Sequence, residues 1–406
     1  MLSRSPKTPA PGVVLAAALS LSCVSATRAQ IDVDVAVRRT GGVRVAVPGQ
    51  TRSPAPARAT NVPSARAATA PSAVAPVVTC DAPVAEVALG PRRSCTRHTD
   101  GRVCCWGAGH GGVPARVEGV ANATHLSLGG ARGCAAQADG SVVCWSGAAA
   151  SAVPGLGDVD LIGAGPRQVC ARVRGDGVRC WGDRVAVPTR VEGVDDVASF
   201  SVGVDPCVVT SARGLHCWGD GLLYTYRHAD PWAGLYRHYT LRALRDVRTV
   251  SVGWREHAAG DAFVCAVTGD RRLWCWGGMF DGSHDRETGA TTGRMTPVNV
   301  AGVSDAVTVA AGGAHACVIR GNAKLWCWGD NAHGQLGDGT RVHRNVPVEV
   351  RGIGEVTAVA ASEGHTCAQA RDGSLWCWGR NRDGELGDGS AEDRDLPVRV
   401  RQAPSG

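Results

Sequence analysis

The stretch CVIRGNAKLWCWGDNAHGQLGDGT, residues 317–340, holds two cysteines ten positions apart, follows the second with Trp-Gly, and continues into a glycine-rich segment. This spacing recurs seven times, and tryptophan follows the second cysteine in every copy, with glycine next in all copies except the one with Ser146. Successive copies lie roughly 36 to 58 residues apart, and self-similarity at such a period indicates a repeat array. The pairs are Cys95 and Cys105, Cys134 and Cys144, Cys170 and Cys180, Cys207 and Cys217, Cys265 and Cys275, Cys317 and Cys327, and Cys367 and Cys377.

The composition favours strands over helices. The chain has 54 glycines, 3 Phe and 4 Tyr, and its valine-rich segments are short and bounded by Gly, Asp and Pro, as short strands are. Its 406 residues suit one large closed repeat or two to three ordinary domains.

The formal charge of +6 is concentrated in the N-terminal part of the chain. Residues 1–79 hold nine Lys or Arg and two Asp, which leaves 34 basic and 35 acidic side chains in residues 80–406. Nucleic-acid-binding domains carry a basic excess, so we expect no nucleic-acid partner.

The N-terminus predicts export. Arg4 and Lys7 precede the apolar run VVLAAALSLSCVSA, which is too short to span a bilayer, and small residues follow it. We interpret residues 1–29 as a signal peptide and expect a protein that is secreted, periplasmic or at the cell surface, with no transmembrane helix. In the alternative, Cys23 is the lipidated first residue of a lipoprotein, although Ser20 stands where such signals have an aliphatic residue.

Residues 30–79 are rich in Pro, Ala and Arg and contain few residues that could form a core. Such a composition predicts a disordered linker. The repeat body is expected over residues 80–406.

Export places the cysteines where disulfides persist. Without Cys23, 16 of the 17 cysteines remain, the seven pairs together with Cys80 and Cys104. Cys104 neighbours Cys105 and therefore points to the other face of its strand, which leaves Cys80 as its expected partner. Zinc binding is the competing interpretation of paired cysteines, but zinc pairs usually lie two to four residues apart.

The seventh repeat explains the ten-residue spacing. If Arg371, Asp372 and Gly373 form a hairpin loop with the glycine at positive φ, Cys367 lies directly opposite Cys377 across an antiparallel ladder. Opposed residues have Cα separations of about 4.5 to 5.5 Å, which a disulfide tolerates.

The same repeat predicts four strands, Val356–Ala361, Thr366–Ala370, Leu375–Trp378 and Pro397–Val400. Four short antiparallel strands in each of seven units predict an all-β fold, a seven-bladed β-propeller with one intra-blade disulfide per blade. An open solenoid is the alternative, but its ends need polar caps, and neither terminal repeat has the character of one.

The segments LWCWGDNAHGQLGDGT (325–340) and LWCWGRNRDGELGDGS (375–390) resemble the repeat of the regulator of chromosome condensation family, a seven-bladed propeller. The resemblance covers roughly residues 83 to 400, is strong in repeats six and seven, and fades in repeats one to four. It implies that the chain ends join within one blade, with Val398 and Val400 beside the segment near Cys80.

The family namesake is a nuclear exchange factor for a small GTPase, which conflicts with export, so exchange activity is a remote alternative. The chain is more similar to secreted, cysteine-rich bacterial members, which resemble binding modules. Fold alone does not fix function. From the resemblance to the secreted members, we expect a monomeric, non-enzymatic scaffold that binds or inhibits another extracellular protein. The alternative is a propeller-based lyase or hydrolase that acts on an extracellular glycan or small molecule.

One insertion, residues 220–246 in the fourth repeat, contains all four tyrosines of the protein. Tyr, Trp and Arg dominate binding hot spots, so this segment is the candidate contact surface, with a self-packed loop as the alternative. The candidate binding residues are Tyr224, Tyr226, Arg227, His228, Trp232, Tyr236, Arg237 and Tyr239.

No catalytic, metal or cofactor motif is predicted. DNAHGQLGDG invites a calcium interpretation, yet Ala332 and Gly334 stand where an EF-hand loop needs oxygen ligands. His315 and His365 lie at the same offset before the first cysteine of their repeats, and we interpret them as structural histidines that bond backbone, with catalysis as the alternative.

Overall fold

The computed structural model describes residues 80–183, 185–219, 238–240, 244–255, 263–277 and 294–401. The chain divides into two units, residues 1–71 and 72–406, and every described residue belongs to the second. The predicted signal peptide and linker lie outside the described residues.

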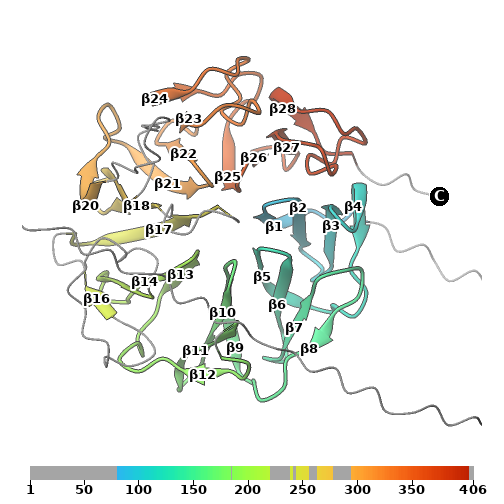
Figure 1. Ribbon diagram of the computed structural model, residues 1–406, viewed down its shortest axis with the longest axis vertical. Coiled ribbons are helices and arrows are strands. Elements are labelled where there is room, and N and C mark those ends of the chain that lie inside the picture. The colour runs from blue at the N-terminus through green and yellow to red at the C-terminus, as the bar shows by residue number, and fades with distance from the viewer. Residues whose placement is uncertain are drawn as a thin grey trace, which may run out of the picture. The chain divides into compact units, whose positions relative to one another are not determined.

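Seven four-stranded antiparallel sheets make up the described part of the chain, which contains no helix. The sheets surround a central axis as the blades of a propeller (Figure 1). The predicted fold, with four antiparallel strands per blade and one disulfide pair per blade, is confirmed.

The first four blades contain strands β1 to β16. Their bounds are β1 (Val84–Gly90), β2 (Arg93–His98), β3 (Val103–Gly107) and β4 (Gly111–Arg116); β5 (Ala123–Gly129), β6 (Arg132–Gln137), β7 (Val142–Trp145) and β8 (Ser151–Ala152); β9 (Val159–Ala164), β10 (Gln168–Val173), β11 (Gly177–Gly182) and β12 (Thr189–Arg190); β13 (Ser199–Val202), β14 (Pro206–Val209), β15 (Leu215–Trp218) and β16 (His238–Thr240).

Blades 5 to 7 contain strands β17 to β28. Their bounds are β17 (Val247–Gly253), β18 (Phe263–Thr268), β19 (Leu273–Gly277) and β20 (Arg294–Asn299); β21 (Ala306–Ala311), β22 (His315–Arg320), β23 (Leu325–Gly329) and β24 (Arg344–Glu349); β25 (Val356–Ala361), β26 (His365–Ala370), β27 (Leu375–Gly379) and β28 (Arg394–Arg399).

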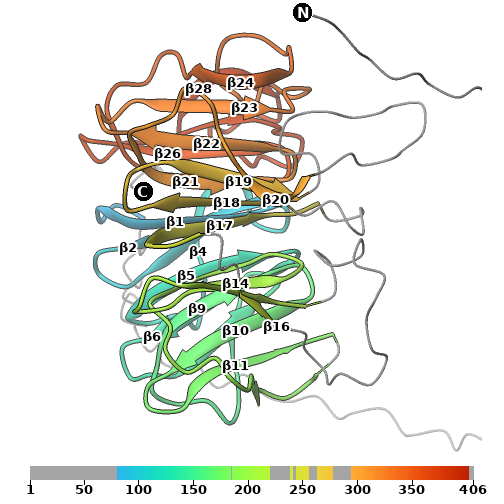
Figure 2. The same ribbon diagram turned by 90° about the vertical axis from the view of Figure 1, so that its left-hand side faces the viewer.

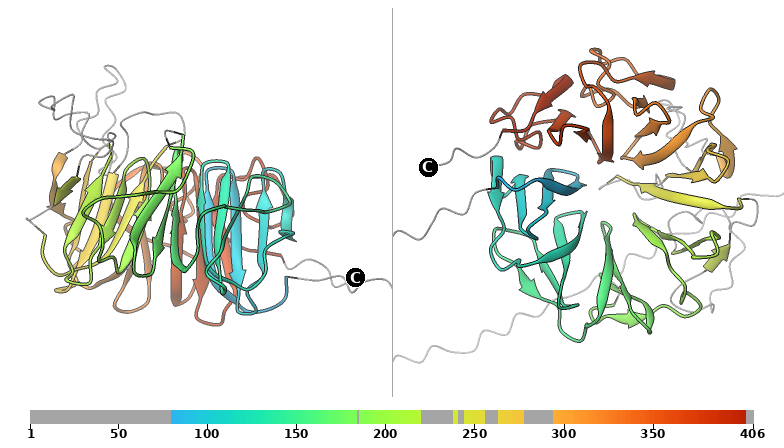
Figure 3. Two further views of the ribbon diagram at one scale, coloured as in Figure 1. Left: turned by 90° about the horizontal axis from the view of Figure 1, so that it is seen from below. Right: turned by 180° about the vertical axis from the view of Figure 1, so that it is seen from behind.

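Strand order within every sheet follows the sequence, so each blade is one continuous segment of chain. The first strand of a blade lies nearest the axis and the fourth lies at the rim (Figure 1). Seen from the side, the strands run from one face of the ring to the other (Figures 2 and 3). A closed ring of this kind limits the sheet edges to the short outer strands.

The seventh blade tests the predicted strand bounds. The first strand is confirmed as Val356–Ala361, and the second and third each extend one residue further than predicted. The fourth was predicted too late, since it spans Arg394–Arg399 instead of Pro397–Val400. An irregularity between Cys377 and Gly379 shifts the register, so that Gly379 pairs with Arg394 and the outer strand begins earlier.

The predicted cysteine register is confirmed, since Cys367 pairs with Cys377 and Gly373 has a φ of 84°. All seven repeat disulfides have Cα separations of 4.0–4.1 Å, slightly below the expected range. The eighth joins Cys80 to Cys104 across 6.3 Å between Cα atoms.

The tryptophan that follows each second cysteine packs between blades. Trp378 of blade 7 contacts Cys317 and Cys327 of blade 6, and Trp106 of blade 1 contacts the Cys367 disulfide of blade 7. The other five tryptophans lie against the preceding blade in the same way. Each disulfide is therefore the surface on which the indole of the next blade is buried.

The position after this tryptophan requires glycine, because another backbone segment lies very close to it. Gly379 has a φ of 101°, and a Cβ there would lie 2.4 Å from the carbonyl oxygen of Gly364. A larger residue would meet both the steric cost of positive φ and this clash.

The expected closure of the ring is wrong in one respect. The chain ends do not share a blade, because β1 to β4 form one sheet and β25 to β28 another. The N-terminal strand completes its own blade, so no place in it remains for a C-terminal strand. Val398 and Val400 do pack against the same buried cluster as Val87 and Leu89 of β1, and Val400 lines a cleft together with Cys80.

Candidate interaction surface

The connections between strands define two faces of the ring. In an antiparallel four-stranded blade, the first-to-second and third-to-fourth connections leave on one face, and the second-to-third hairpins leave on the other. We call these the loop face and the hairpin face. On the loop face lie residues 312–314 and 330–343 of blade 6 and residues 362–364 and 380–393 of blade 7.

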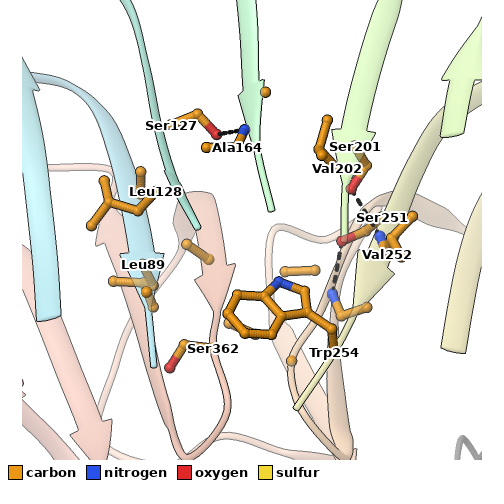
Figure 4. Close-up of a pocket in the computed structure, with 18 of the residues that line it drawn as sticks. Leu89, Ser127, Leu128, Ala164, Ser201, Val202, Ser251, Val252, Trp254 and Ser362 are labelled. Atoms are coloured by element: carbon orange, nitrogen blue, oxygen red, sulfur yellow. Dashed lines mark hydrogen bonds between the residues drawn. The ribbon is translucent and has the colours of Figure 1, made fainter. Parts of the chain in front are cut away.

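The seven innermost strands enclose a channel of about 270 Å³. Trp254, which directly follows β17, is half-buried, and its indole extends across the channel among the ends of these strands (Figure 4). The corresponding positions after the other innermost strands hold Pro, Gly, Val or Glu. A single large aromatic side chain therefore marks the channel on the loop face.

Serine hydroxyls join neighbouring innermost strands around this channel (Figure 4). Ser127 Oγ accepts a hydrogen bond from the Ala164 backbone N–H at 2.8 Å. Ser201 Oγ accepts from Val252 N at 2.8 Å, and Ser251 Oγ accepts from Ala311 N at 2.9 Å. These bonds hold blade 2 to blade 3, blade 4 to blade 5, and blade 5 to blade 6.

Ion pairs cross between blades on the loop face. Arg255 of blade 5 lies 3.7 Å from Asp330 of blade 6, measured from Nη2 to Oδ2, and His333 Nδ1 of blade 6 lies 2.8 Å from Asp393 Oδ2 of blade 7. Arg92 of blade 1 makes a bidentate contact with Asp383 of blade 7 at 2.7 and 2.8 Å, and the hydrogen bond from Arg92 lowers the pKa of the Asp383 carboxyl. These contacts give three carboxylates of blades 6 and 7 a partner in a neighbouring blade.

The glycine-rich loop of blade 6 holds blade 7. Asn331 is fully buried and fixes the loop from within, since its Oδ1 accepts from Leu336 N at 3.0 Å and its Nδ2 donates to the Thr340 carbonyl at 2.9 Å. The loop thereby presents the Gln335 carbonyl, which accepts from Trp378 Nε1 at 2.9 Å and from Thr366 Oγ1 at 2.9 Å.

The loop of blade 7 holds blade 1 in the same manner. The Glu385 carbonyl accepts from Trp106 Nε1 at 2.7 Å and from Ser94 Oγ at 2.8 Å. Ser94 and Trp106 are register partners, as are Thr366 and Trp378, so each hydroxyl and its indole converge on one carbonyl. The motif that resembled a calcium loop is an inter-blade latch.

The two histidines complete these latches, which corrects the expectation that they bond backbone. His315 Nε2 lies 2.8 Å from Thr366 Oγ1, and His365 Nε2 lies 2.9 Å from Ser94 Oγ. Each hydroxyl already donates to a carbonyl and therefore accepts from the ring, which fixes the neutral Nε2–H tautomer. Both rings bridge to the next blade through a side-chain hydroxyl.

Burial keeps both histidines neutral. It lowers the pKa of His315 to about 4 and that of His365 to about 3, with nearby arginine charge as a smaller cause for both. His315 Nδ1 is buried without a hydrogen-bond partner among the described residues. Both side chains are buried, and their hydrogen bonds join neighbouring blades.

The predicted contact residues Tyr224, Tyr226, Arg227, His228, Trp232, Tyr236 and Arg237 lie outside the described residues. Of Tyr239 the structure places the backbone, in β16 opposite Cys217. Residues 219–237, which include most of the predicted insertion, connect β15 to β16 and so form a third-to-fourth connection of the ring. Trp254 was not predicted, although an aromatic residue directly after the glycine of the first strand was a signal in the sequence.

Within the described part of the chain, no group of three or more His, Cys, Asp or Glu residues could hold a metal ion. The described residues also include no helix with the length and apolar character needed to cross a membrane. Eight disulfides indicate an oxidising environment for the folded protein.

Sequence profiles of the regulator of chromosome condensation (RCC1) repeat match the C-terminal blades. One profile matches residues 322–369 and 372–406, and a second matches residues 254–283, 306–335 and 356–385. RCC1 repeats are therefore detected in blades 5 to 7.

The relatives found by sequence are eukaryotic. The chain is 28% identical to the ultraviolet-B receptor UVR8 of Arabidopsis thaliana over 203 residues, 45% of this chain and 44% of the receptor. It is 26% identical to human E3 ubiquitin-protein ligase HERC2 over 172 residues, 42% of this chain and 3% of the ligase. The chain thus spans less than half the length of either relative.

Solved structures agree with the fold. Human WBSCR16 superposes with a TM-score of 0.59 at 19% identity, over 71% of this chain and 84% of that protein. Prp20p of Saccharomyces cerevisiae superposes with a TM-score of 0.55 at 16% identity, over 78% of this chain and 76% of that protein. At these identities the likeness concerns the fold alone.

Proposed function

We propose that this chain is an exported, bacterial, monomeric interaction scaffold that binds or inhibits an extracellular protein through its loop face. An RCC1-like propeller supports a role in protein interaction. Beyond this role, we propose that the protein is exported and bacterial, that its partner is an extracellular protein, and that it binds through the loop face.

The observation that carries the proposal is the position of Trp254. Trp254 is half-buried in the centre of the loop face, and the predicted insertion connects β15 to β16, which end and begin at that same face. Hot spots combine such side chains near the centre of an interface. Rigid support by disulfides and latches would reduce the ordering cost of binding.

The likeness to known binders points the same way. Prp20p, the yeast RCC1, is described with its binding to Gsp1p and histones and has also been solved bound to Kap60. We carry over only the mode, a propeller that presents one surface to a protein, since these partners belong to those proteins.

The test begins with affinity capture from the secreted fraction and identification of a stoichiometric partner. Its affinity is then measured by calorimetry for the mature chain, for Trp254→Ala, and for Tyr224→Ala combined with Trp232→Ala. Truncation of a hot-spot residue costs about 2 kcal/mol, so we expect each variant to bind about 30-fold more weakly. Thermal stability should stay unchanged.

Arg371→Ala is the matched control, because Arg371 is an exposed side chain of the blade 7 hairpin on the opposite face. We expect it to bind as the unaltered protein does. Full affinity in both aromatic variants, or a loss of stability that matches the loss of affinity, would refute the proposal.

A further inference from the structure

Six of the seven junctions between blades are filled by the chain that connects them. An apolar side chain of each connection from the fourth strand to the next first strand lies in the core between the two blades. Four of these connections have related sequences, VEGV, VEGV, VAGV and VRGI. The inserted residues are Val120, Leu156, Val194, Leu244, Val303 and Ile353.

The junction between blades 7 and 1 has no such connection, because β28 ends at Arg399 and β1 begins at Val84 on separate parts of the chain. A cleft of about 620 Å³ lies there, within the range of 300 to 1,000 Å³ typical of ligand sites. Blades 1 and 7 lie side by side (Figure 1).

The cleft corresponds to the place that Ile353 occupies between blades 6 and 7. Five residues that surround the Ile353 cluster, Leu325, Val350, Val356, Ala368 and Trp378, have register equivalents that line the cleft, namely Leu375, Val400, Val84, Thr96 and Trp106. Val400 thus fills the position of the first valine of the VRGI connection. The sequence counterpart of its isoleucine is Ala403, a smaller residue that lies outside the described part of the chain.

One wall of the cleft is formed by the segment before β1, which is held by contacts outside the repeat pattern. The Cys80–Cys104 disulfide holds the segment before β1, His98 Nδ1 donates to the Ala82 carbonyl, and Gln369 Nε2 donates to the Val84 carbonyl at 2.9 Å. The eighth disulfide, which lies outside the repeat pattern, therefore builds one side of the cleft.

The rim gives the cleft a chemical preference. Arg399 and Arg401 line it where the blade 6 junction has Glu349 and Arg351. Asp81 and Asp372 also line it, but the Asp372 carboxylate already accepts hydrogen bonds from Ser374 N and Oγ. Hydrogen bonds from Ser374 lower the pKa of the Asp372 carboxyl most, and the charge of Arg399 lowers it further.

We propose that this cleft binds an extended acidic peptide segment of another protein, which inserts a valine or isoleucine side chain where the other junctions hold their own. The apolar side chain would complete the core between blades 7 and 1, and acidic neighbours would meet the arginine rim. The site is separate from the loop face, so it does not depend on the function proposed above.

The chain itself supplies the probe. Residues 192–197, Glu-Gly-Val-Asp-Asp-Val, form part of the connection between blades 3 and 4, where Val194 and Val197 are both buried. A fluorescein-labelled copy of this hexapeptide is titrated into the mature full-length protein and followed by anisotropy. The matched control peptide, Glu-Gly-Ser-Asp-Asp-Ser, keeps the charge and lacks the apolar side chains.

We expect saturable binding that is at least about tenfold tighter for the valine peptide, because two buried apolar side chains exceed the 1.4 kcal/mol that tenfold requires. Arg399→Glu should weaken it about fivefold, the scale of a partly exposed ion pair. Gln402→Gly with Ala403→Ile recreates the VRGI sequence after Val400 and should abolish binding by filling the cleft.

Equal binding of the two peptides, or undiminished binding to both Arg399→Glu and the filled variant, would overturn the proposal. Arg399→Glu changes only a rim residue, so the test stands even if the filled variant does not fold. Tighter peptide binding to Val77→Ser with Val78→Ser would also overturn it, since the segment before Cys80 would then be the natural occupant.

Discussion

Two sets of junctions hold the propeller together by different means. Between blades 6 and 7, and between blades 7 and 1, a loop carbonyl receives an indole and a hydroxyl, and a buried histidine bonds the hydroxyl. Between blades 2 and 3, 4 and 5, and 5 and 6, a serine near the channel accepts a backbone N–H. The positions of those serines hold Ala310 and Ala360 in blades 6 and 7.

One junction shows how a latch is lost. Blade 1 joins its third and fourth strands through residues 108–110, which are too few to form the latch, and Trp145 Nε1 of blade 2 is accordingly buried without a hydrogen-bond partner among the described residues. Blade 1 also has Ala88 at the position of the inner serine, so this junction keeps the buried indole with neither polar contact. Loss of the motif therefore does not mean loss of the blade.

The largest expected effect comes from the latch indole. Trp378→Ala should lower the free energy of unfolding by about 3 to 5 kcal/mol, because it removes a fully buried side chain and one of two donors to the Gln335 carbonyl. Chemical denaturation measures this. Trp378→Phe should still lose about 1 kcal/mol and Trp145→Phe less, since only the former loses a hydrogen bond; equal losses would contradict the distinction between the two junctions.

The next effect is the dependence of the latches on pH. The pKa of His315 falls from 6.5 to about 4 in the folded protein, so below pH 6.5 the unfolded chain binds the proton more tightly and stability decreases as the pH falls. At pH 5 this costs about 2 kcal/mol relative to pH 7.5. His315→Gln should reduce the fall in unfolding free energy between pH 7.5 and pH 5 by about 2 kcal/mol and leave the contribution of His365 in place, whereas an unchanged curve would mean that His315 can be protonated in place.

The serine contact should be worth less than the indole. Ser251→Ala leaves the Ala311 N–H without its acceptor, which costs about 1 to 2 kcal/mol. Ala310→Ser, the equivalent position of blade 6, is the control, because the latch already holds that junction and little gain is expected. Thermal unfolding of the two variants measures this. An unchanged melting temperature for Ser251→Ala would show that the serine does not hold blades 5 and 6 together.

The smallest effect concerns Glu385, which stands where blade 6 has Gln335. Burial raises the pKa of Glu385, and its Oε1 lies 3.5 Å from Arg380 Nε without a hydrogen-bond partner in the described part of the chain. A raised folded pKa means that stability is highest below the unfolded value of 4.5 and is lost as the pH rises through the folded value. Glu385→Gln should therefore stabilise the protein at pH 7 by up to about 1 kcal/mol, and a destabilised variant would show that the Arg380 contact outweighs burial.

The sequence contained part of the site. A hydroxyl residue directly before the first cysteine occurs only in repeats one and seven, as Ser94 and Thr366. The preceding repeat in the ring has a histidine two positions before its first cysteine, His365 in repeat seven and His315 in repeat six. The occurrence of a histidine in one repeat and a hydroxyl residue in the next was a signal for the latch, and our interpretation of the histidines did not use it. Trp254 was visible as an isolated aromatic residue, but the channel around it was not.

By itself the sequence determined the cysteine pairing, the antiparallel register of each hairpin and the number of blades, because these depend on contacts between residues ten positions apart or on repetition that can be counted. The closure of the ring and the cleft between blades 7 and 1 were decided only by the tertiary structure. These features arise where residues nearly three hundred positions apart meet, as His365 meets Ser94, and local spacing carries no record of such a meeting.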